Sequence, residues 1–226
     1  MIGPIHDFPY LLEQVSDHMS QDKTLPLMHG VYFEARGAFL YAVATDRYTL
    51  AVSRRRLEQG PARPWSVLIG AQDLKLLRAF ARLNRRTPLV LERERDVWGG
   101  ESLTVRANGQ RLEVPAVDGP LSEFWQRGTW RTLLADHIGQ TPDMRREIRV
   151  NPTMLARWGR ARGAERNEPL TVWCSGPRKP LVVACGADFI GLQMPITSDD
   201  QAPGRNEVVD GWSDLAPRQV AGERAA

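Results

Sequence analysis

The sequence predicts an α+β fold made of a repeated module, in which a strand and a helix are followed by three antiparallel strands. Two observations support this prediction. Short runs of alternating apolar and polar residues, separated by turns, indicate a three-strand meander in residues 31–53. Amphipathic helical segments begin near Phe8, Ala71 and Pro152, and strand patterns follow each of them, so the same order of elements recurs along the chain.

The first module has the clearest pattern. Strands are expected at 31–36, 39–45 and 48–53. The middle strand is apolar at nearly every position, so it should lie centrally in a sheet with both faces covered. A helix is expected at 8–19, because its apolar residues form one stripe that consists of Phe8, Leu11, Leu12, Val15 and Met19.

In the second module, a strand at 65–69 precedes a helix at 71–83, which Pro88 prevents from continuing. The Asn108-Gly109 pair is typical of a type I′ hairpin turn, which needs a positive φ at both positions. The strands of this module are expected at 89–93, 102–107 and 111–114, and residues 117–124 close the unit.

The third module follows a connector, residues 129–145, for which one short helix is expected. Asn151 and Pro152 favour a helix start, because they provide an N-cap and a proline in the first turn. This helix should reach residue 162, with Leu155 and Trp158 facing inward and Arg157 and Arg160 facing outward. Strands are expected before it at 147–150 and after it at 170–174, 181–184 and 189–196.

Composition argues for a soluble protein and against several other classes. No apolar run approaches the roughly 20 residues that span a bilayer, so no membrane association is expected, and the N-terminus lacks a secretory pattern. Cys174 and Cys185 are interpreted as core thiols in a reducing cytoplasm. The net charge is +3, and the acidic segment 198–226 leaves the rest of the chain more basic than that, which favours a polyanionic partner.

No residue pattern indicates catalysis. The four histidines show no ligand spacing, so neither a metal nor another cofactor is expected. There is no glycine-rich phosphate loop and no nucleophile with a base in a motif, so the chain is predicted not to be an enzyme. Asp46 could be a catalytic acid, but a turn aspartate that caps backbone N–H groups is the favoured interpretation.

Several short motifs in this order resemble those of the bacterial DNA polymerase sliding clamp, the beta subunit of DNA polymerase III. They are His29-Gly30-Val31, Ala44-Thr45-Asp46, Thr49-Leu50-Ala51, Val117-Asp118-Gly119 and Leu192-Gln193-Met194-Pro195-Ile196. Three positions depart from the family pattern: Thr49 replaces an arginine, Arg47 a glycine and Ser122 a proline. The Arg47 departure puts the geometry of the turn after Thr45 in doubt.

The resemblance implies the DNA-clamp fold, with antiparallel sheets outside and helices on the inner face. The chain would be a shortened version of the clamp. Residues 1–127 would be a complete domain of two modules, 128–146 a connector, 147–197 half a domain, and 198–226 a polar tail that we expect to be disordered.

The resemblance also implies double-stranded DNA as a partner, bound without sequence specificity through phosphates. The implied DNA-binding residues are Lys23, Lys75, Arg78, Arg82, Arg85, Arg157 and Arg160. The alternative is that these are solvated helix faces, and the acidic residues Glu13 and Asp17 of the first helix argue mildly for it.

A second implied site is a cleft that takes short hydrophobic peptides of DNA polymerase and other replication proteins. An apolar, Met-containing groove suits a varied set of partners. Its implied wall consists of Met28, Thr45, Tyr48, Leu50, Leu192, Met194, Pro195 and Ile196. Leu50 and Leu192 could equally be ordinary core residues.

Three functions remain open. The favoured one is a cytoplasmic processivity factor in DNA replication, a homo-oligomeric ring or partial ring, with a clamp loader as a conceivable further partner. The second is a monomeric clamp-like adaptor that binds replication proteins without encircling DNA. The third and weakest is a small DNA- or RNA-binding regulator that uses the basic helices. Because the number of modules is odd, one half-domain lacks its partner, which predicts self-association.

Overall fold

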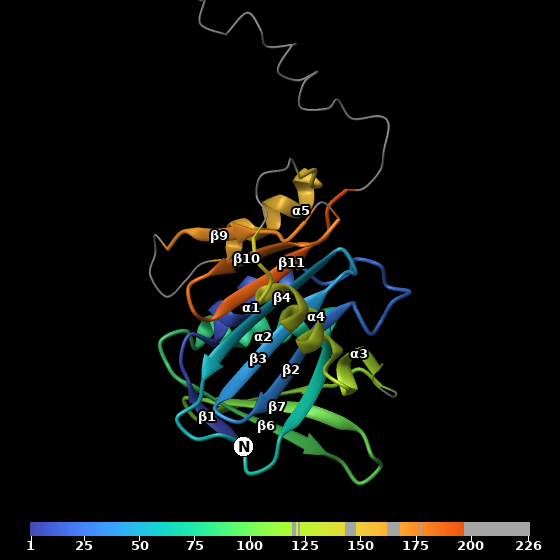
Figure 1. Ribbon diagram of the computed structural model, residues 1–226. Helices are drawn as coiled ribbons and strands as arrows, with labels where there is room; N and C mark the ends of the chain where they lie inside the picture. The colour runs from blue at the N-terminus through green and yellow to red at the C-terminus, as the bar shows by residue number, and fades with distance from the viewer. Residues whose placement is uncertain (119–120, 122, 143–147, 162–167, 177, 197–226) are drawn as a thin grey trace, which may run out of the picture.

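The computed structural model of the chain describes residues 1–118, 121, 123–142, 148–161, 168–176 and 178–196 (Figure 1). The larger of its two sheets has seven antiparallel strands in the order β5-β2-β3-β4-β11-β10-β9. Their bounds are β5 Trp65–Gly70, β2 Gly30–Arg36, β3 Phe39–Thr45, β4 Thr49–Arg56, β11 Phe189–Gln193, β10 Leu181–Cys185 and β9 Leu170–Trp173.

The smaller sheet has four antiparallel strands in the order β1-β6-β7-β8. Their bounds are β1 Ile2–Ile5, β6 Leu89–Arg95, β7 Glu101–Ala107 and β8 Gln110–Pro115. The helices are α1 Phe8–Ser16, α2 Ala71–Leu83, α3 Glu123–Gln126, α4 Thr129–Ile138 and α5 Pro152–Arg157, followed by a 3-10 turn at Trp158–Arg160. Among the described residues, no helix is both long enough and apolar enough to cross a membrane.

The first two modules interlock by exchanging their first strands. β1 precedes α1 in the chain but pairs with β6 of the other sheet. In the same way β5 precedes α2 but pairs with β2. Sequence reasoning gave no bounds for β1, because four residues that include Pro4 show no alternation. Pairing with β6 is what makes this segment a strand.

Alternation along the strands divides the buried residues between two faces of the large sheet. Val31 and Phe33 of β2 belong to the core that also contains Phe8, Leu11 and Leu12 of α1. This inner face is the one covered by α1 and α2. Tyr32, the residue between them, belongs to a separate cluster on the opposite, outer face. Val43 and Ala44 on β3 point to opposite faces and are both fully buried, so the prediction of a central strand covered on both sides is confirmed.

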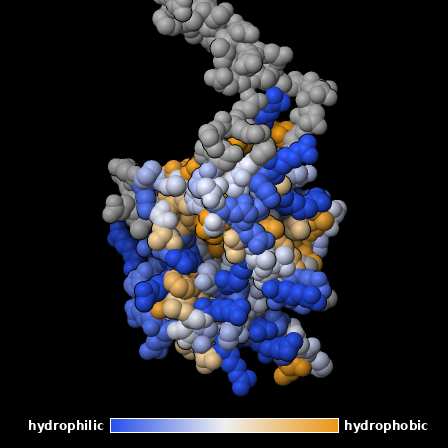
Figure 2. Space-filling model, viewed as in Figure 1, coloured by the Kyte–Doolittle hydropathy of each residue, from blue (hydrophilic) through white to orange (hydrophobic). Residues whose placement is uncertain are grey.

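The outer cluster is our name for the buried apolar group on the outer face. Strands of the large sheet supply Tyr32, Val43, Leu50, Val52, Leu68, Val182 and Leu192. The connector supplies Trp125 of α3 and Trp130 and Leu134 of α4. Figure 1 shows α4 lying across this face. On the surface of the molecule seen from this side, hydrophobic residues form separate patches among hydrophilic ones rather than one continuous area (Figure 2).

The third module departs from prediction in several ways. Residues 148–150 have no regular structure, so the strand expected at 147–150 is not found in its described part. Its helix is regular only from Pro152 to Arg157. Leu155 was expected to face inward but is 46% exposed, whereas Trp158 is buried as predicted. Residue 147, the end of the predicted helix at 162 and the tail from residue 197 lie outside the described residues.

Candidate peptide and nucleic-acid interfaces

The junction of β4 and β11 joins two segments that are far apart in sequence. Five residue pairs form this antiparallel ladder, and Leu50 lies opposite Leu192. Beyond the ladder, the Met194 backbone N–H donates to the Tyr48 carbonyl at 2.8 Å. Thr45 of β3 lies opposite Leu50 on its other side. The register therefore brings the Thr45-to-Leu50 motif next to the Leu192-to-Ile196 motif, as the resemblance implied.

Asp46 holds the turn at this junction and ties it to the third module. One carboxylate oxygen accepts hydrogen bonds from the backbone N–H groups of Tyr48 at 3.0 Å and Thr49 at 2.7 Å. The other accepts from the Arg157 guanidinium at 2.6 Å. Burial alone would raise the pKa of Asp46, but the hydrogen bonds from Arg157 and Thr49 bring it below its usual value. The favoured interpretation of Asp46 as a capping residue fits these contacts.

The turn adopts the geometry that a glycine would favour. Arg47 has a φ of 78°, in the left-handed region that residues with a side chain rarely adopt. Asp46 and the Thr45 hydroxyl hold this conformation, since Oγ1 of Thr45 accepts from the Arg47 backbone N–H at 3.2 Å. Side-chain hydrogen bonds thus compensate for the missing glycine.

His18 lies just after α1 and is buried against the third module. Its ring centroid lies 4.3 Å from that of Trp158. Burial, assisted by the positive charge of Arg157 and opposed by Asp46, lowers the pKa of His18 to about 3. The Trp158 indole N–H donates to the Gln193 side chain at 2.5 Å, which connects this packing to β11.

The residues assigned to the peptide cleft fall into two groups. Tyr48, Met194 and Ile196 are 54%, 43% and 42% exposed, and we call them the exposed rim. Leu50 and Leu192 are only 3% exposed and belong to the outer cluster. Thr45 is buried, and Met28 and Pro195 are partly buried. The exposed rim is thus accessible, whereas the two leucines are covered.

The residues assigned to DNA binding differ widely in their surroundings. Lys23, Lys75 and Arg85 are exposed. Three others are in ion pairs: Arg82 with Glu13 at 3.2 Å, Arg160 with Asp17 at 2.9 Å, and Arg157 with Asp46 at 2.6 Å. Arg157 was expected to face outward, but its side chain is only 19% exposed. Arg78 is partly buried, and burial lowers its pKa.

A basic groove runs between the start of α1 and the end of α2. Its volume is about 500 Å³, and Arg82, Arg85 and Arg86 contribute its positive charge. Asp7 and Glu13 line it as well, so it is not uniformly positive. The residues expected to bind DNA include Arg82 and Arg85 but not Arg86, although Arg86 directly follows Arg85.

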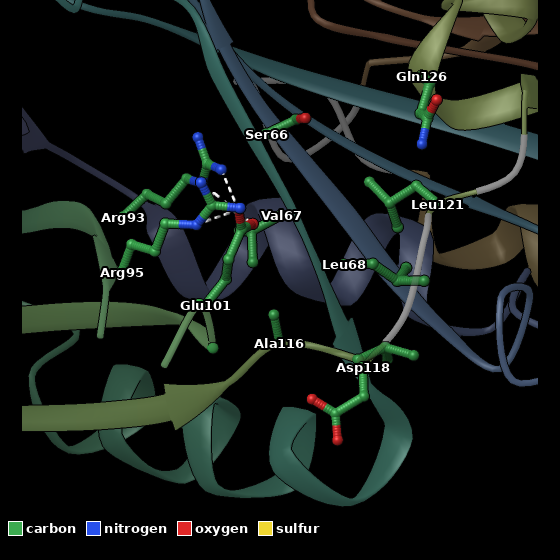
Figure 3. A pocket seen from close by; sticks show the side chains of 13 residues that line it. Ser66, Val67, Leu68, Arg93, Arg95, Glu101, Ala116, Asp118, Leu121 and Gln126 are labelled. Atoms are coloured by element: carbon green, nitrogen blue, oxygen red, sulfur yellow. Dashed lines mark hydrogen bonds and ion pairs between the residues drawn. The ribbon is translucent and has the colours of Figure 1, made fainter. Parts of the chain in front are cut away.

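A second hollow, of about 450 Å³, lies between the two sheets and α3, and no pattern in the sequence indicated it. Figure 3 shows Arg93, Arg95 and Glu101 pointing toward one another on one side of it, with Leu121 and Gln126 on the other. Both arginines pair with Glu101, whose single negative charge offsets only one of theirs, and Asp118 also lines the hollow. Among the described residues, no group of three or more metal-ligating side chains is arranged to bind a metal ion.

Comparisons with known proteins agree with the motif resemblance. The family model for the central domain of the DNA polymerase III beta subunit matches residues 4–91. A sequence search among curated proteins finds no match.

Solved structures of similar fold include DNA polymerase III beta subunits and a sliding clamp. A putative DNA polymerase III beta subunit from Eubacterium rectale ATCC 33656 is 12% identical over 88% of this chain and 65% of its own, with a TM-score of 0.66. The beta subunit from Thermotoga maritima is 12% identical over 84% and 63%, with a TM-score of 0.62. The Bacillus subtilis sliding clamp is 16% identical over 88% and 66%, with a TM-score of 0.58.

This likeness confirms the predicted clamp fold and the resemblance to a shortened beta subunit. The chain spans less than two thirds of the length of each of these three solved proteins.

The burial of His18 predicts that stability falls in mild acid. The unfolded chain binds a proton at His18 near pH 6.5, whereas the folded chain does so only near pH 3. The contribution of neutral His18 to the free energy of unfolding is therefore complete above pH 6.5 and is lost as the pH falls toward 3. Between pH 6.5 and 4.5, His18 should reduce the free energy of unfolding by about 1.4 kcal/mol per pH unit.

Urea unfolding of wild type and His18→Gln at several pH values measures this slope. The variant should show the shallower dependence, and His6→Gln, at an exposed histidine, should keep the wild-type slope. Parallel pH curves for wild type and His18→Gln would contradict the prediction.

Proposed function

We propose that this chain is a sliding-clamp-like processivity factor in DNA replication. It docks DNA polymerase and other replication proteins through short hydrophobic peptides at the β4–β11 junction, and it binds double-stranded DNA without sequence preference along its helical face. The observation that carries the proposal is the exposed rim. Three large apolar side chains stand open to solvent at the point where two clamp motifs meet.

The exposed rim has the chemistry for peptide docking. Met194 can adapt its shape to different side chains, and Tyr48 combines an apolar ring with a polar end. Their backbones are hydrogen-bonded to each other at 2.8 Å, so the two side chains come from one fixed element. A Leu or Phe anchor of a peptide would bury its surface against them.

The DNA proposal is supported by the exposed charges of α2. Lys75 lies on the helix and Arg85 just after its end, and both are exposed. Arginine and lysine that contact phosphates bind DNA without reading its sequence, which permits sliding.

A second candidate is an adaptor that docks replication proteins but does not encircle DNA. The observation in its favour is that Arg82, Arg157 and Arg160 are each paired with an acidic residue. Those pairs reduce the charge that the helices offer to DNA. The two candidates share the peptide site and differ in DNA retention and in self-association.

The peptide site predicts that Tyr48→Ala combined with Met194→Ala weakens peptide binding at least tenfold. Each substitution removes apolar surface worth roughly 1.5 kcal/mol or more to a bound anchor. Because both side chains are about half exposed, the fold should survive. Fluorescence anisotropy with a labelled Leu- and Phe-containing peptide of a replicative polymerase measures the affinity. Leu83→Ala, at an 84% exposed residue of α2, should bind like wild type. Unchanged affinity in the double variant would reject the site.

The exposed side chains of Lys75 and Arg85 provide the test of DNA binding. Lys75→Glu with Arg85→Glu should weaken binding to a DNA duplex and reduce the dependence of affinity on salt concentration. Arg56→Glu with Arg63→Glu makes the same charge change at exposed residues away from α2, and it should have a smaller effect. If the two double variants lose affinity equally, α2 is not the DNA-binding element.

Self-association discriminates the processivity factor from the adaptor. β9 is the last strand of the large sheet, and its Leu170 and Val172 are 40% and 37% exposed. An apolar edge strand invites pairing with another chain. Light scattering should therefore detect a dimer or a larger closed assembly at micromolar concentration, which Leu170→Lys with Val172→Lys should dissociate. A strict monomer over a hundredfold concentration range would instead support the adaptor.

A further inference from the structure

Helix α4 of the connector covers part of the surface to which the peptide site was assigned. Trp130 and Leu134 lie one turn apart on the same helical face and are 2% and 5% exposed. Both belong to the outer cluster together with Leu50 and Leu192. An amphipathic helix with its apolar side in an apolar groove is also how many proteins bind peptides.

The chain just before α4 is firmly attached. The Trp125 ring of α3 stacks on Tyr32, with centroids 4.8 Å apart. Its indole N–H donates to the Leu27 carbonyl at 2.7 Å, and the Tyr32 hydroxyl donates to the Trp125 carbonyl at 3.3 Å. These contacts fix the position from which α4 departs.

The attachment of α4 itself is less complete. Trp130 Nε1, Arg131 Nε and His137 Nδ1 are buried without a hydrogen-bond partner among the described residues. Each of these atoms would regain hydrogen bonds to water if the helix left the sheet, which opposes its docking. The residue before the helix, Gly128, has no side chain that could cap its first turn. The Arg131 guanidinium acts in the other direction, because it lies 4.2 Å from the Tyr41 ring centroid and 3.1 Å from Glu34.

We propose that α4 is an internal ligand of the apolar outer face of the large sheet, which an incoming peptide displaces. This inference rests on the proposed function. The exposed rim would receive the peptide first, and Leu50 and Leu192 would become available only when Trp130 and Leu134 leave. The apparent affinity for the peptide is then the intrinsic affinity multiplied by the fraction of molecules in which α4 is undocked. The preferred peptide carries an aromatic and a leucine residue one helical turn apart, as α4 does.

The test uses the connector sequence itself as the probe. A labelled synthetic peptide of residues 123–138 is titrated with the full-length chain, and fluorescence anisotropy gives the affinity. Leu134→Ala weakens the docking of α4 and should bind this peptide at least tenfold more tightly than wild type. Leu133→Ala makes the same change at a neighbouring residue that is 41% exposed, and it should bind like wild type. Equal or weaker binding by Leu134→Ala overturns the proposal.

Hydrogen exchange of the wild type provides a second readout that does not depend on the stability of the variant. Saturating peptide should accelerate exchange of the α4 amides while leaving β4 and β11 protected. Unchanged or slower exchange in α4 rejects displacement.

A peptide of a replicative polymerase separates this inference from the proposed function. If it binds wild type through Tyr48 and Met194 but leaves α4 exchange unchanged, the internal ligand is rejected and the peptide site stands. If the connector peptide displaces α4 but the polymerase peptide binds neither wild type nor Leu134→Ala, the internal ligand stands and the proposed function is rejected.

Discussion

Pairing of β4 with β11 is the interaction on which the rest of the structure depends. It places Leu50 opposite Leu192 on the outer face and brings Trp158 against the inner face. The approach is close, because a Cβ added at Gly191 would lie 2.4 Å from the Leu50 carbonyl oxygen and 2.5 Å from the Trp158 ring. Only a glycine permits this packing at the observed register. A shift of one residue would exchange the faces and break both contacts.

Local signals in the sequence determined much of the fold. Helix α2 has the predicted bounds, Ala71–Leu83, because a glycine precedes it and an apolar stripe continues to its end. The Asn108-Gly109 turn has positive φ at both residues, 50° and 73°, as its sequence predicts. Elements that arise only from tertiary contacts were missed. β1 depends on β6, and the inward direction of Arg157 depends on Asp46, which lies 111 positions away in the chain.

The candidate sites were predictable to a similar extent. The family resemblance implied that Tyr48 and Met194 belong to one site, and the register of β4 and β11 brings their backbones together. The packing of α4 into the buried cluster that contains Leu50 was not predictable, because a short helix with two buried residues has no periodic signal strong enough to reveal its docking site. The pairing of Arg82 with Glu13 depends on how α1 and α2 pack side by side, which charge counting along the chain does not capture.

Exposure separates the arginine pairs of the helical face into two kinds. The Arg82–Glu13 pair has side chains that are 65% and 38% exposed, and the Arg160–Asp17 pair is 55% and 32% exposed. Such pairs contribute little to stability, so a phosphate could exchange for either carboxylate at small cost. The Arg157–Asp46 pair is only 19% and 10% exposed, and breaking it would leave a buried charge without its partner. Arg82 and Arg160 therefore remain available to a polyanion, whereas Arg157 holds the Asp46 turn at the β4–β11 junction.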